Sequence, residues 1–153
     1  MTREDAYYER IRLLCGYWDN YEDWLNTYLE TENPLSDIVL KLVDCGDDMK
    51  EVERALNLYC LEKAFDEESV YKMMRKELCD NYQNGVITKD EVASALFRFS
   101  QNIPDCYFQN CCGALSDYYE LAQLGILDMK KFDAVLGRWL DNGCKFVMDE
   151  MMR

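Results

Sequence analysis

An all-α fold is predicted for this chain of 153 residues, as a compact bundle of about seven to eight helices built from helical hairpins. Apolar residues recur at spacings of three and four through most of the chain, and stretches that alternate like strands are few. A glycine followed by a polar helix-capping residue occurs three times, at intervals of 39 and 40 residues. One domain over residues 1–153 suits this length, and a short solenoid-like array of helix pairs is the alternative arrangement.

Capping residues, apolar spacing and helix-ending glycines place the individual helices. Asn33 is expected to cap the third helix, with Pro34 at its first position, where a missing N–H is harmless. An irregular stretch is expected from Pro104 and includes residues 106–113, and Gly143 is expected to end the last helix before a short segment at 145–152. The predicted helices span residues 3–15, 19–30, 34–46, 48–64, 66–82, 88–101, 116–124 (or from an earlier start) and 128–140.

The three corners at Gly46, Gly85 and Gly125 share one pattern. A helix ends, the glycine adopts the left-handed conformation, a polar N-cap follows, and the next helix begins. In each following helix, three apolar residues stand at matching offsets and are expected to face inward. These residues are Val52, Ala55 and Leu56, then Val92, Ala95 and Leu96, then Phe132, Val135 and Leu136.

Residues 80–91, DNYQNGVITKDE, match the calcium-loop template of an EF-hand except that Tyr82 occupies the third position. The corner at Gly125 aligns with this loop without a gap, yet Leu124 and Lys131 stand at its ligand positions. The requirements of a turn between two helices therefore explain Gly85, Ile87 and Thr88 of this loop without calcium binding. A degenerate calcium loop, or another carboxylate metal site, is the alternative hypothesis; no cofactor and no metal ligand is expected.

Residue composition argues against catalysis. The chain has no histidine, which excludes Ser-His-Asp and Cys-His mechanisms and His-ligated metals, and it lacks phosphate-binding and nucleophile-elbow motifs. The eight cysteines form no C-x-x-C pair, and Cys106, Cys111 and Cys112 are a weak cluster. The charged start of the chain is unlike a signal peptide, and no apolar run suits a membrane span. A cytoplasmic protein with reduced cysteines, not an enzyme, is expected.

Charge is the strongest functional signal in the sequence. Thirty acidic residues against seventeen basic ones give a net charge of −13, and no Lys or Arg occurs from Leu13 to Leu40. This field favours a basic protein partner, and disfavours direct nucleic-acid binding and anionic membranes. In the helix at 19–30, Trp18, Tyr21, Leu25 and Tyr28 are the expected buried stripe. The expected partner-binding residues are Asp19, Glu22, Asp23, Trp24, Glu30 and Glu32. A merely solvated acidic face is the alternative.

The segment YWDNYEDWLNTYLETEN, with this composition, resembles bacterial toxin-immunity proteins, which are small, acidic and helical. The resemblance implies a stoichiometric inhibitor in the cytoplasm that forms a one-to-one complex with a basic toxin, such as a nuclease, and blocks its active site. A phage-encoded inhibitor of a nucleic-acid-processing complex has a similar profile. The oligomeric state does not follow from the sequence.

Overall fold

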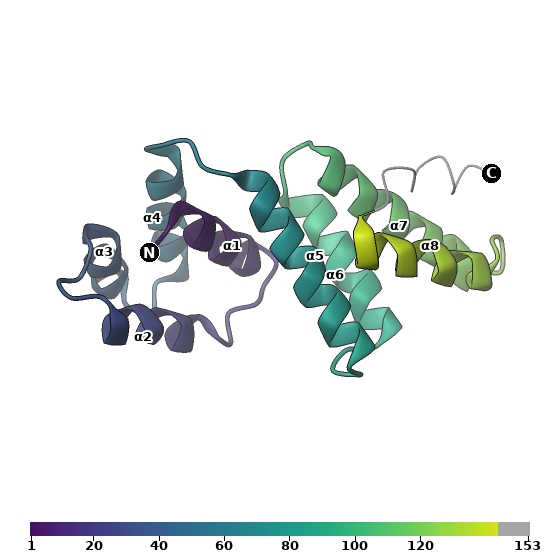
Figure 1. Ribbon diagram of the computed structural model, residues 1–153, viewed down its shortest axis with the longest axis horizontal. Helices are drawn as coiled ribbons and strands as arrows, with labels where there is room; N and C mark the ends of the chain where they lie inside the picture. Colours follow the sequence, from purple (N-terminus) through teal and green to yellow (C-terminus); the bar gives the residue numbers. More distant parts are fainter. Residues whose placement is uncertain (144–153) are drawn as a thin grey trace. The chain divides into compact units, whose positions relative to one another are not determined.

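The computed structural model describes residues 1–143 and confirms the all-α prediction, with eight helices and no strand in that range (Figure 1). The chain divides into two compact units, Met1–Val70 and Tyr71–Arg153, with the boundary inside the fifth helix. A single domain over 1–153 remains a prediction. The helices are α1 (Arg3–Leu14), α2 (Tyr21–Thr31), α3 (Asp37–Cys45), α4 (Met49–Leu61), α5 (Glu67–Gln83), α6 (Lys89–Asn102), α7 (Tyr107–Gln123) and α8 (Met129–Asn142).

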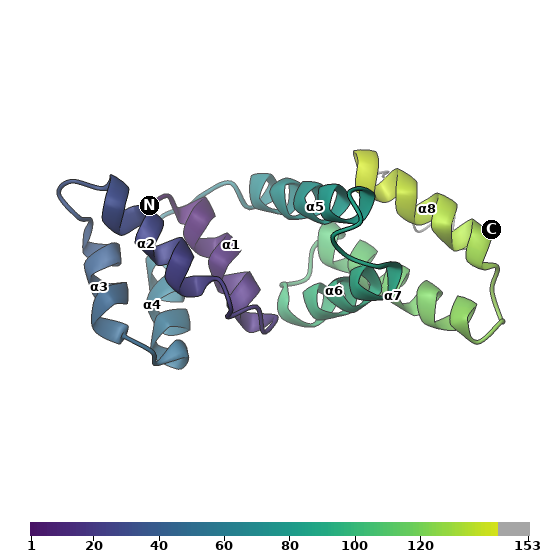
Figure 2. The ribbon, with the colours of Figure 1, turned by 90° about the horizontal axis from the view of Figure 1, so that it is seen from below.

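In the first unit, α4 packs against both α1 and α3, and α2 lies beside α3 (Figure 2). Polar contacts also join α1 to α4. The Arg3 guanidinium donates to the Tyr59 carbonyl at 3.1 Å and lies 4.4 Å from the centre of the Tyr59 ring, and Arg10 pairs with Glu53 at 2.8 Å. The apolar core of these helices includes Ala6, Ile11, Val39, Leu42, Val52 and Leu56, each at most 1% exposed.

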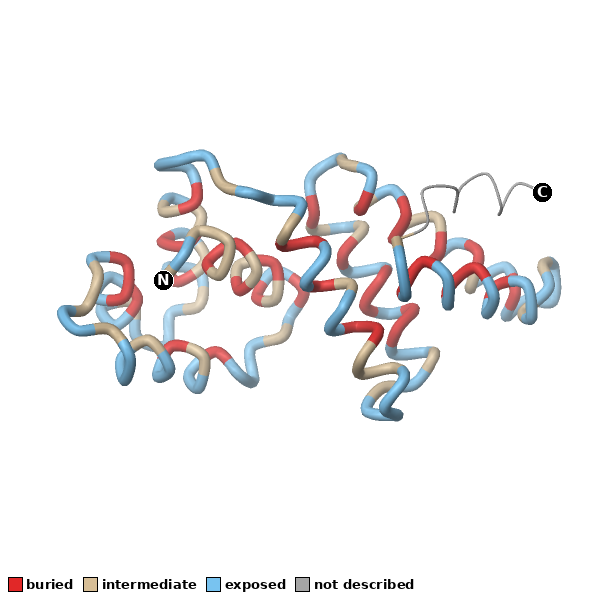
Figure 3. Tube along the Cα trace, in the orientation of Figure 1, coloured by how far each residue is buried: buried red, intermediate tan, exposed pale blue. Residues whose placement is uncertain are grey.

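The second unit is built from two helical hairpins, α5–α6 and α7–α8, that meet along α6 and α7. Buried and exposed residues alternate in helical register along all four helices (Figure 3). An aromatic cluster fills the centre: the Phe108 ring stacks on Tyr71 with centroids 5.0 Å apart and lies 5.6 Å from the ring of Trp139. Trp139 is 2% exposed, so this cluster contributes a large share of the buried apolar area.

The corners at Gly85 and Gly125 have the same hydrogen bonds, as the sequence alignment of the two predicted. Gly85 N–H donates to the Tyr82 carbonyl at 3.2 Å, and the next residue's N–H donates to the Asn81 carbonyl at 2.8 Å. The equivalent distances at Gly125 are 3.1 and 3.0 Å. The φ angles of these glycines are +72° and +75°, as a Schellman motif requires. All nine apolar residues predicted to face inward after the three corners are buried.

The corner at Gly46 differs from these two in its backbone conformation. A corner of the same kind at Gly16 was not predicted from the sequence. Gly46 has the predicted positive φ of +55°, but its ψ of −129° lies outside the left-handed helical region. Gly16, after α1, makes the Schellman pair of bonds instead, with Gly16 N–H to Leu13 at 3.0 Å and Tyr17 N–H to Arg12 at 2.9 Å.

Side-chain contacts link the helices that flank the two corners of the second unit. The Gln123 side chain at the end of α7 donates to Asp90 at the start of α6 at 3.2 Å, and Lys89 pairs with Asp133 of α8 at 2.6 Å. Each hairpin therefore repeats the same helix, glycine corner and capped helix, next to its neighbour.

Replacing Gly85 or Gly125 with valine is expected to lower the free energy of unfolding by about 1–2 kcal/mol, because a β-branched residue resists positive φ. No neighbouring atom lies within 4 Å of an added Cβ at either position, so backbone strain alone determines the cost. Gly137 in α8 is the matched control. It has equal space around it and no positive φ, so Gly137→Ala should stabilise by about 0.5–1 kcal/mol. Urea denaturation measures all three; a neutral result at both corners contradicts the assignment.

Two predicted helix starts and one predicted irregular stretch were wrong. The third helix begins at Asp37 after Ser36, because Glu32 accepts the Ser36 N–H at 3.0 Å and holds the preceding residues as a loop. The second begins at Tyr21 after Asn20, and not at residue 19 as predicted. The seventh begins at Tyr107, so the stretch 106–113 is helical and not irregular. Its N-cap is Cys106, whose sulfur accepts the Gln109 N–H at 3.4 Å, a role that capping rules assign to Ser, Thr, Asp or Asn. The predicted segment 145–152 lies outside the described residues.

Candidate functional site

The acidic surface predicted from the sequence lies on α2 and on the loop before it. Asp19, Glu22, Asp23 and Glu30 are all exposed, as expected for residues off the apolar stripe. Tyr21 and Leu25 form the buried side of α2, and no basic residue occurs in the helix. We call Trp18, Asp19, Glu22, Asp23 and Glu30 the acidic-aromatic surface.

Trp18 was predicted to be buried, and that prediction was wrong. Its side chain is 57% exposed, the most of any aromatic residue among the exposed large apolar ones of residues 1–143. The corner at Gly16 ends α1 early, so Trp18 stands in the connecting loop and outside the periodicity of α2. Its indole N–H donates to the Leu13 carbonyl at 2.9 Å, which fixes the ring in place. A fixed, exposed indole beside carboxylates is a stronger anchor candidate than Trp24.

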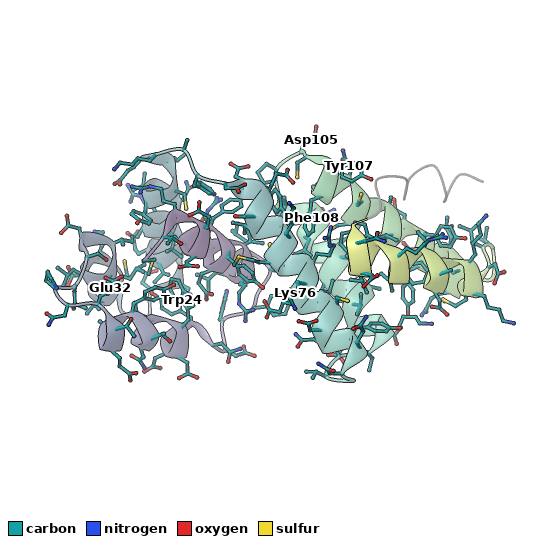
Figure 4. The ribbon with its side chains drawn as sticks, in the orientation of Figure 1. Trp24, Glu32, Lys76, Asp105, Tyr107 and Phe108 are labelled. Carbon is teal, nitrogen blue, oxygen red and sulfur yellow. The ribbon has the colours of Figure 1, made fainter. Side chains whose placement is uncertain are left out.

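Trp24, predicted near the boundary of the buried stripe, is half-buried on α2 (Figure 4). Its ring lies between Tyr21 and Tyr28, with centroids 6.0 and 5.1 Å apart, the second pair edge to face. These ring contacts stabilise the buried side of α2. Part of the Trp24 ring stays exposed and can contact a partner. Tyr28 is half-buried and so partly fulfils its predicted place in the stripe.

Glu32 differs from the other predicted partner-binding residues, because it already has partners inside the fold (Figure 4). Its carboxylate accepts a hydrogen bond from the N-terminal ammonium of Met1 and another from the Ser36 N–H at 3.0 Å. The ammonium contact, followed by the Ser36 bonds, lowers the pKa of Glu32 to about 2. Glu32 therefore ties the end of α2 to the start of the chain.

The net charge is distributed unequally between the two units. Residues 1–70 contain 18 acidic and 7 basic residues, a net −11, whereas residues 71–153 contain 12 and 10, a net −2. The negative field therefore arises almost wholly from the unit that carries the acidic-aromatic surface.

The calcium-loop alternative meets a specific obstacle in residues 80–91. Glu91, the twelfth-position ligand of an EF-hand, is part of a capping box: it accepts the Thr88 N–H at 3.2 Å while Thr88 accepts the Glu91 N–H at 3.2 Å. Asp80, the first-position residue, pairs with Lys76 at 2.8 Å. Within residues 1–143, no group of three or more Cys, Asp or Glu side chains is placed to hold a metal ion.

Most of the cysteines are buried at separate positions and do not gather into one site. Cys111 and Cys112 are fully buried in α7, and Cys106 caps that helix. Cys45, Cys60, Cys79 and Cys106 are free thiols, and Cys144 lies outside the described range. Burial raises the pKa of Cys60 to about 11 and also raises the pKa of Cys79, so both thiols stay protonated and unreactive at neutral pH.

A groove of about 370 Å³ lies between α5 and α8, with basic and acidic side chains in its lining. Lys76 on its rim pairs with Asp80, and the Arg75 guanidinium packs against the backbone of Gly143 (Figure 4). The Arg75 contact ties α5 to the end of α8. The lining residues are Lys72, Arg75, Lys76, Cys79, Asp80, Gln83, Leu140 and Asp141.

Comparisons of the chain with protein-family models, curated proteins and solved structures found no match. No helix in the described part of the chain is long and apolar enough to cross a membrane.

Proposed function

We propose that this protein is a small acidic binding protein, not an enzyme, that neutralises a basic protein partner stoichiometrically, in the manner of an immunity protein acting on a nuclease toxin. One observation carries the proposal. Trp18 stands exposed and fixed in the loop before α2, in a segment that also carries the exposed Asp19, Glu22 and Asp23 and contains no Lys or Arg.

The two kinds of side chain on this surface have complementary roles in binding. Carboxylates accelerate the encounter with a basic partner, and the acceleration weakens as salt is added. An exposed indole supplies contact area and a π face for a Lys or Arg side chain of that partner, which slows dissociation. Together they suit a surface that carries lysines and arginines, such as the phosphate-binding face of a nuclease.

The proposal is tested with an identified partner. Proteins captured from the host of origin by the wild-type chain are compared with those captured by the variant Asp19→Lys, Glu22→Lys, Asp23→Lys. A protein captured only by the wild type is then purified, and its stoichiometry is measured by calorimetry and its activity by titration. A one-to-one complex that abolishes the partner's activity supports the proposal. An acidic partner, or a partner whose activity survives saturation, contradicts it.

The calcium alternative gives a separate prediction. Millimolar calcium is expected to shift the melting temperature no more than magnesium does, because Glu91 serves the capping box. Thr88→Ala should cost about 1 kcal/mol of stability with or without calcium, whereas Glu91→Gln keeps a capping-box side chain and should cost little. Thermal denaturation monitored by circular dichroism measures these shifts. A calcium-selective rise that Glu91→Gln abolishes supports the EF-hand hypothesis instead.

A further inference from the structure

Glu9, in the middle of α1, is the charged residue that the fold buries most completely within residues 1–143. Its side chain is 3% exposed, and its Oε1 atom has no hydrogen-bond partner among the described residues. Its Oε2 atom lies 3.6 Å from the Nε atom of Arg12, one turn along the same helix. A buried carboxylate with half of its acceptor capacity unused is costly when ionised.

The groups near Glu9 come from α2 as well as α1. The Tyr21 hydroxyl of α2 is also buried and has no partner among the described residues, and the charge of Glu9 acts on Tyr21 and Tyr28. Tyr28 forms a hydrogen bond with Asp5 of α1. From α3, Cys45 acts on Tyr21. These residues, with Glu9, define the α1–α2 seam.

The acidic groups of α4 that contact α1 are engaged with other residues. Glu53 pairs with Arg10 at 2.8 Å, and Glu62 pairs with Arg3 at 3.1 Å. The environment of the Glu9 carboxyl is therefore Arg12 on its own helix and the phenols of α2.

The apolar contribution to the attachment of α2 is small. Tyr21 and Leu25 are its buried residues, whereas α1 buries Ala6, Tyr7, Ile11 and Leu13 in addition to Glu9. At its far end α2 is tied down by Glu32 and the N-terminal ammonium. At its start α2 buries Tyr21, whose ring is near Glu9 of α1, and α2 also packs against α3.

We propose that Glu9 is a proton-controlled switch: as a neutral carboxylic acid it holds the first turns of α2 against α1, and as a carboxylate it loosens them. Those turns carry Glu22 and Asp23 and follow directly on Trp18 and Asp19. Proton release at Glu9 would therefore change the order of the acidic-aromatic surface, whatever that surface binds.

The charge change falls in the neutral pH range. Burial raises the pKa of Glu9 from 4.5 to about 7, and the attraction of Arg12 offsets only part of that rise. Burial also raises the pKa values of Tyr21, Tyr28 and Cys45, so these groups stay protonated near neutrality. The titration at neutral pH therefore belongs to the carboxyl of Glu9.

The direction of the effect follows from proton linkage. Below pH 4.5 Glu9 is protonated whether the seam is closed or open, and the closed seam has its full stability. Between pH 4.5 and about 7 the open form releases the proton while the closed form retains it, so opening becomes more favourable. If opening restores the ordinary pKa, its equilibrium constant rises about 300-fold in total and about tenfold between pH 6 and 8.

Hydrogen exchange of the full chain tests the proposal. Exchange of the amides of residues 21–25 is measured at pH 6 and pH 8, corrected for the intrinsic pH dependence of exchange, in the wild type, Glu9→Gln and Glu53→Gln. The expected result is an opening constant about tenfold larger at pH 8 in the wild type and in Glu53→Gln, and unchanged in Glu9→Gln. An equal pH response in wild type and Glu9→Gln overturns the proposal.

A second measurement does not depend on any variant. The ¹³C signal of the Glu9 carboxyl in the wild-type protein, followed by NMR between pH 3 and 9, should titrate near pH 7, and a midpoint below pH 6 overturns the proposal. Neither experiment uses a partner. A failure here would therefore leave the proposed binding function standing, and a failed binding test would leave the switch standing.

Discussion

Glu9→Gln is expected to raise the free energy of unfolding at pH 8 by about 3 kcal/mol and to leave it almost unchanged at pH 4. The wild-type fold at pH 8 contains an ionised carboxylate that is 3% exposed and has an unpartnered oxygen, whereas glutamine fills the same space without charge. The size follows from the rise in the pKa of Glu9 from 4.5 to about 7, at about 1.4 kcal/mol for each pH unit.

The pH range over which Glu9 lowers the free energy of unfolding is a stricter test than the size of the change at pH 8. A raised carboxyl pKa stabilises the fold fully below pH 4.5, and this contribution is lost as pH rises to about 7. Urea denaturation of the wild type across this range should therefore show declining stability, and Glu9→Gln should show a flat profile. A variant that declines in parallel with the wild type would show that another group is responsible.

Glu32 should make the free energy of unfolding increase with pH in the acid range, whereas Glu9 makes it decrease toward neutral pH. Because its pKa is lowered to about 2, its contribution is complete above pH 4.5 and is lost as pH falls toward 2. In the same denaturation series, Glu32→Gln therefore serves as an internal control, altering the acid limb and leaving the neutral limb as in the wild type.

The helices and corners were predictable because local chemistry determines them. Thr88 and Asp128 each accept a backbone N–H of the next turn, and Gly85 and Gly125 adopt the positive φ that other residues avoid. These features depend on neighbours within about six positions, which the sequence displays directly. The missed start at Cys106 is the exception, since a sulfur atom performs a cap that the usual residue preferences do not indicate.

The parts of the site that could not be predicted depend on contacts between segments distant in sequence. Glu32 is engaged by the N-terminal ammonium 31 positions away. Glu9 lies off the stripe of Tyr7, Ile11 and Leu14 that the sequence indicates as inward, yet it is buried, because α1 has α4 on one side and the seam with α2 on another. Leu14 continues the apolar spacing of Tyr7 and Ile11 along α1, yet it is 36% exposed.

The error at Trp18 has a related cause. Helical periodicity was continued from α2 back through Asp19 to Trp18, but the chain there is a loop that follows the Gly16 corner. The signal was present in the sequence as a glycine followed by an apolar residue, Tyr17, as at Gly85 and Val86. A corner recognised at Gly16 would have placed Trp18 outside the helix and identified it as an exposed anchor candidate.

Binding kinetics distinguish the roles of carboxylates and indole on the acidic-aromatic surface. Reversal of Asp19, Glu22 and Asp23 to lysine is expected to slow association with the basic partner at least tenfold at low salt, with a smaller effect at high salt. The matched control reverses Asp105, Asp117 and Glu120, three exposed acids of the second unit, and so has the same net charge. If both triple variants slow association equally, net charge alone steers the partner and this surface is only solvated.

Truncation of Trp18 should act on the other rate constant. Trp18→Ala is expected to raise the dissociation rate about 30-fold, the equivalent of a 2 kcal/mol anchor, and to leave association and the circular dichroism spectrum unchanged, because the ring is 57% exposed. Phe97, 54% exposed on the second unit, supplies the control Phe97→Ala, which should leave both rates as they are. Trp24→Ala should instead lower stability, since its ring packs between Tyr21 and Tyr28. A faster dissociation with Trp24→Ala but not with Trp18→Ala would reverse this assignment and move the anchor to the inner side of α2.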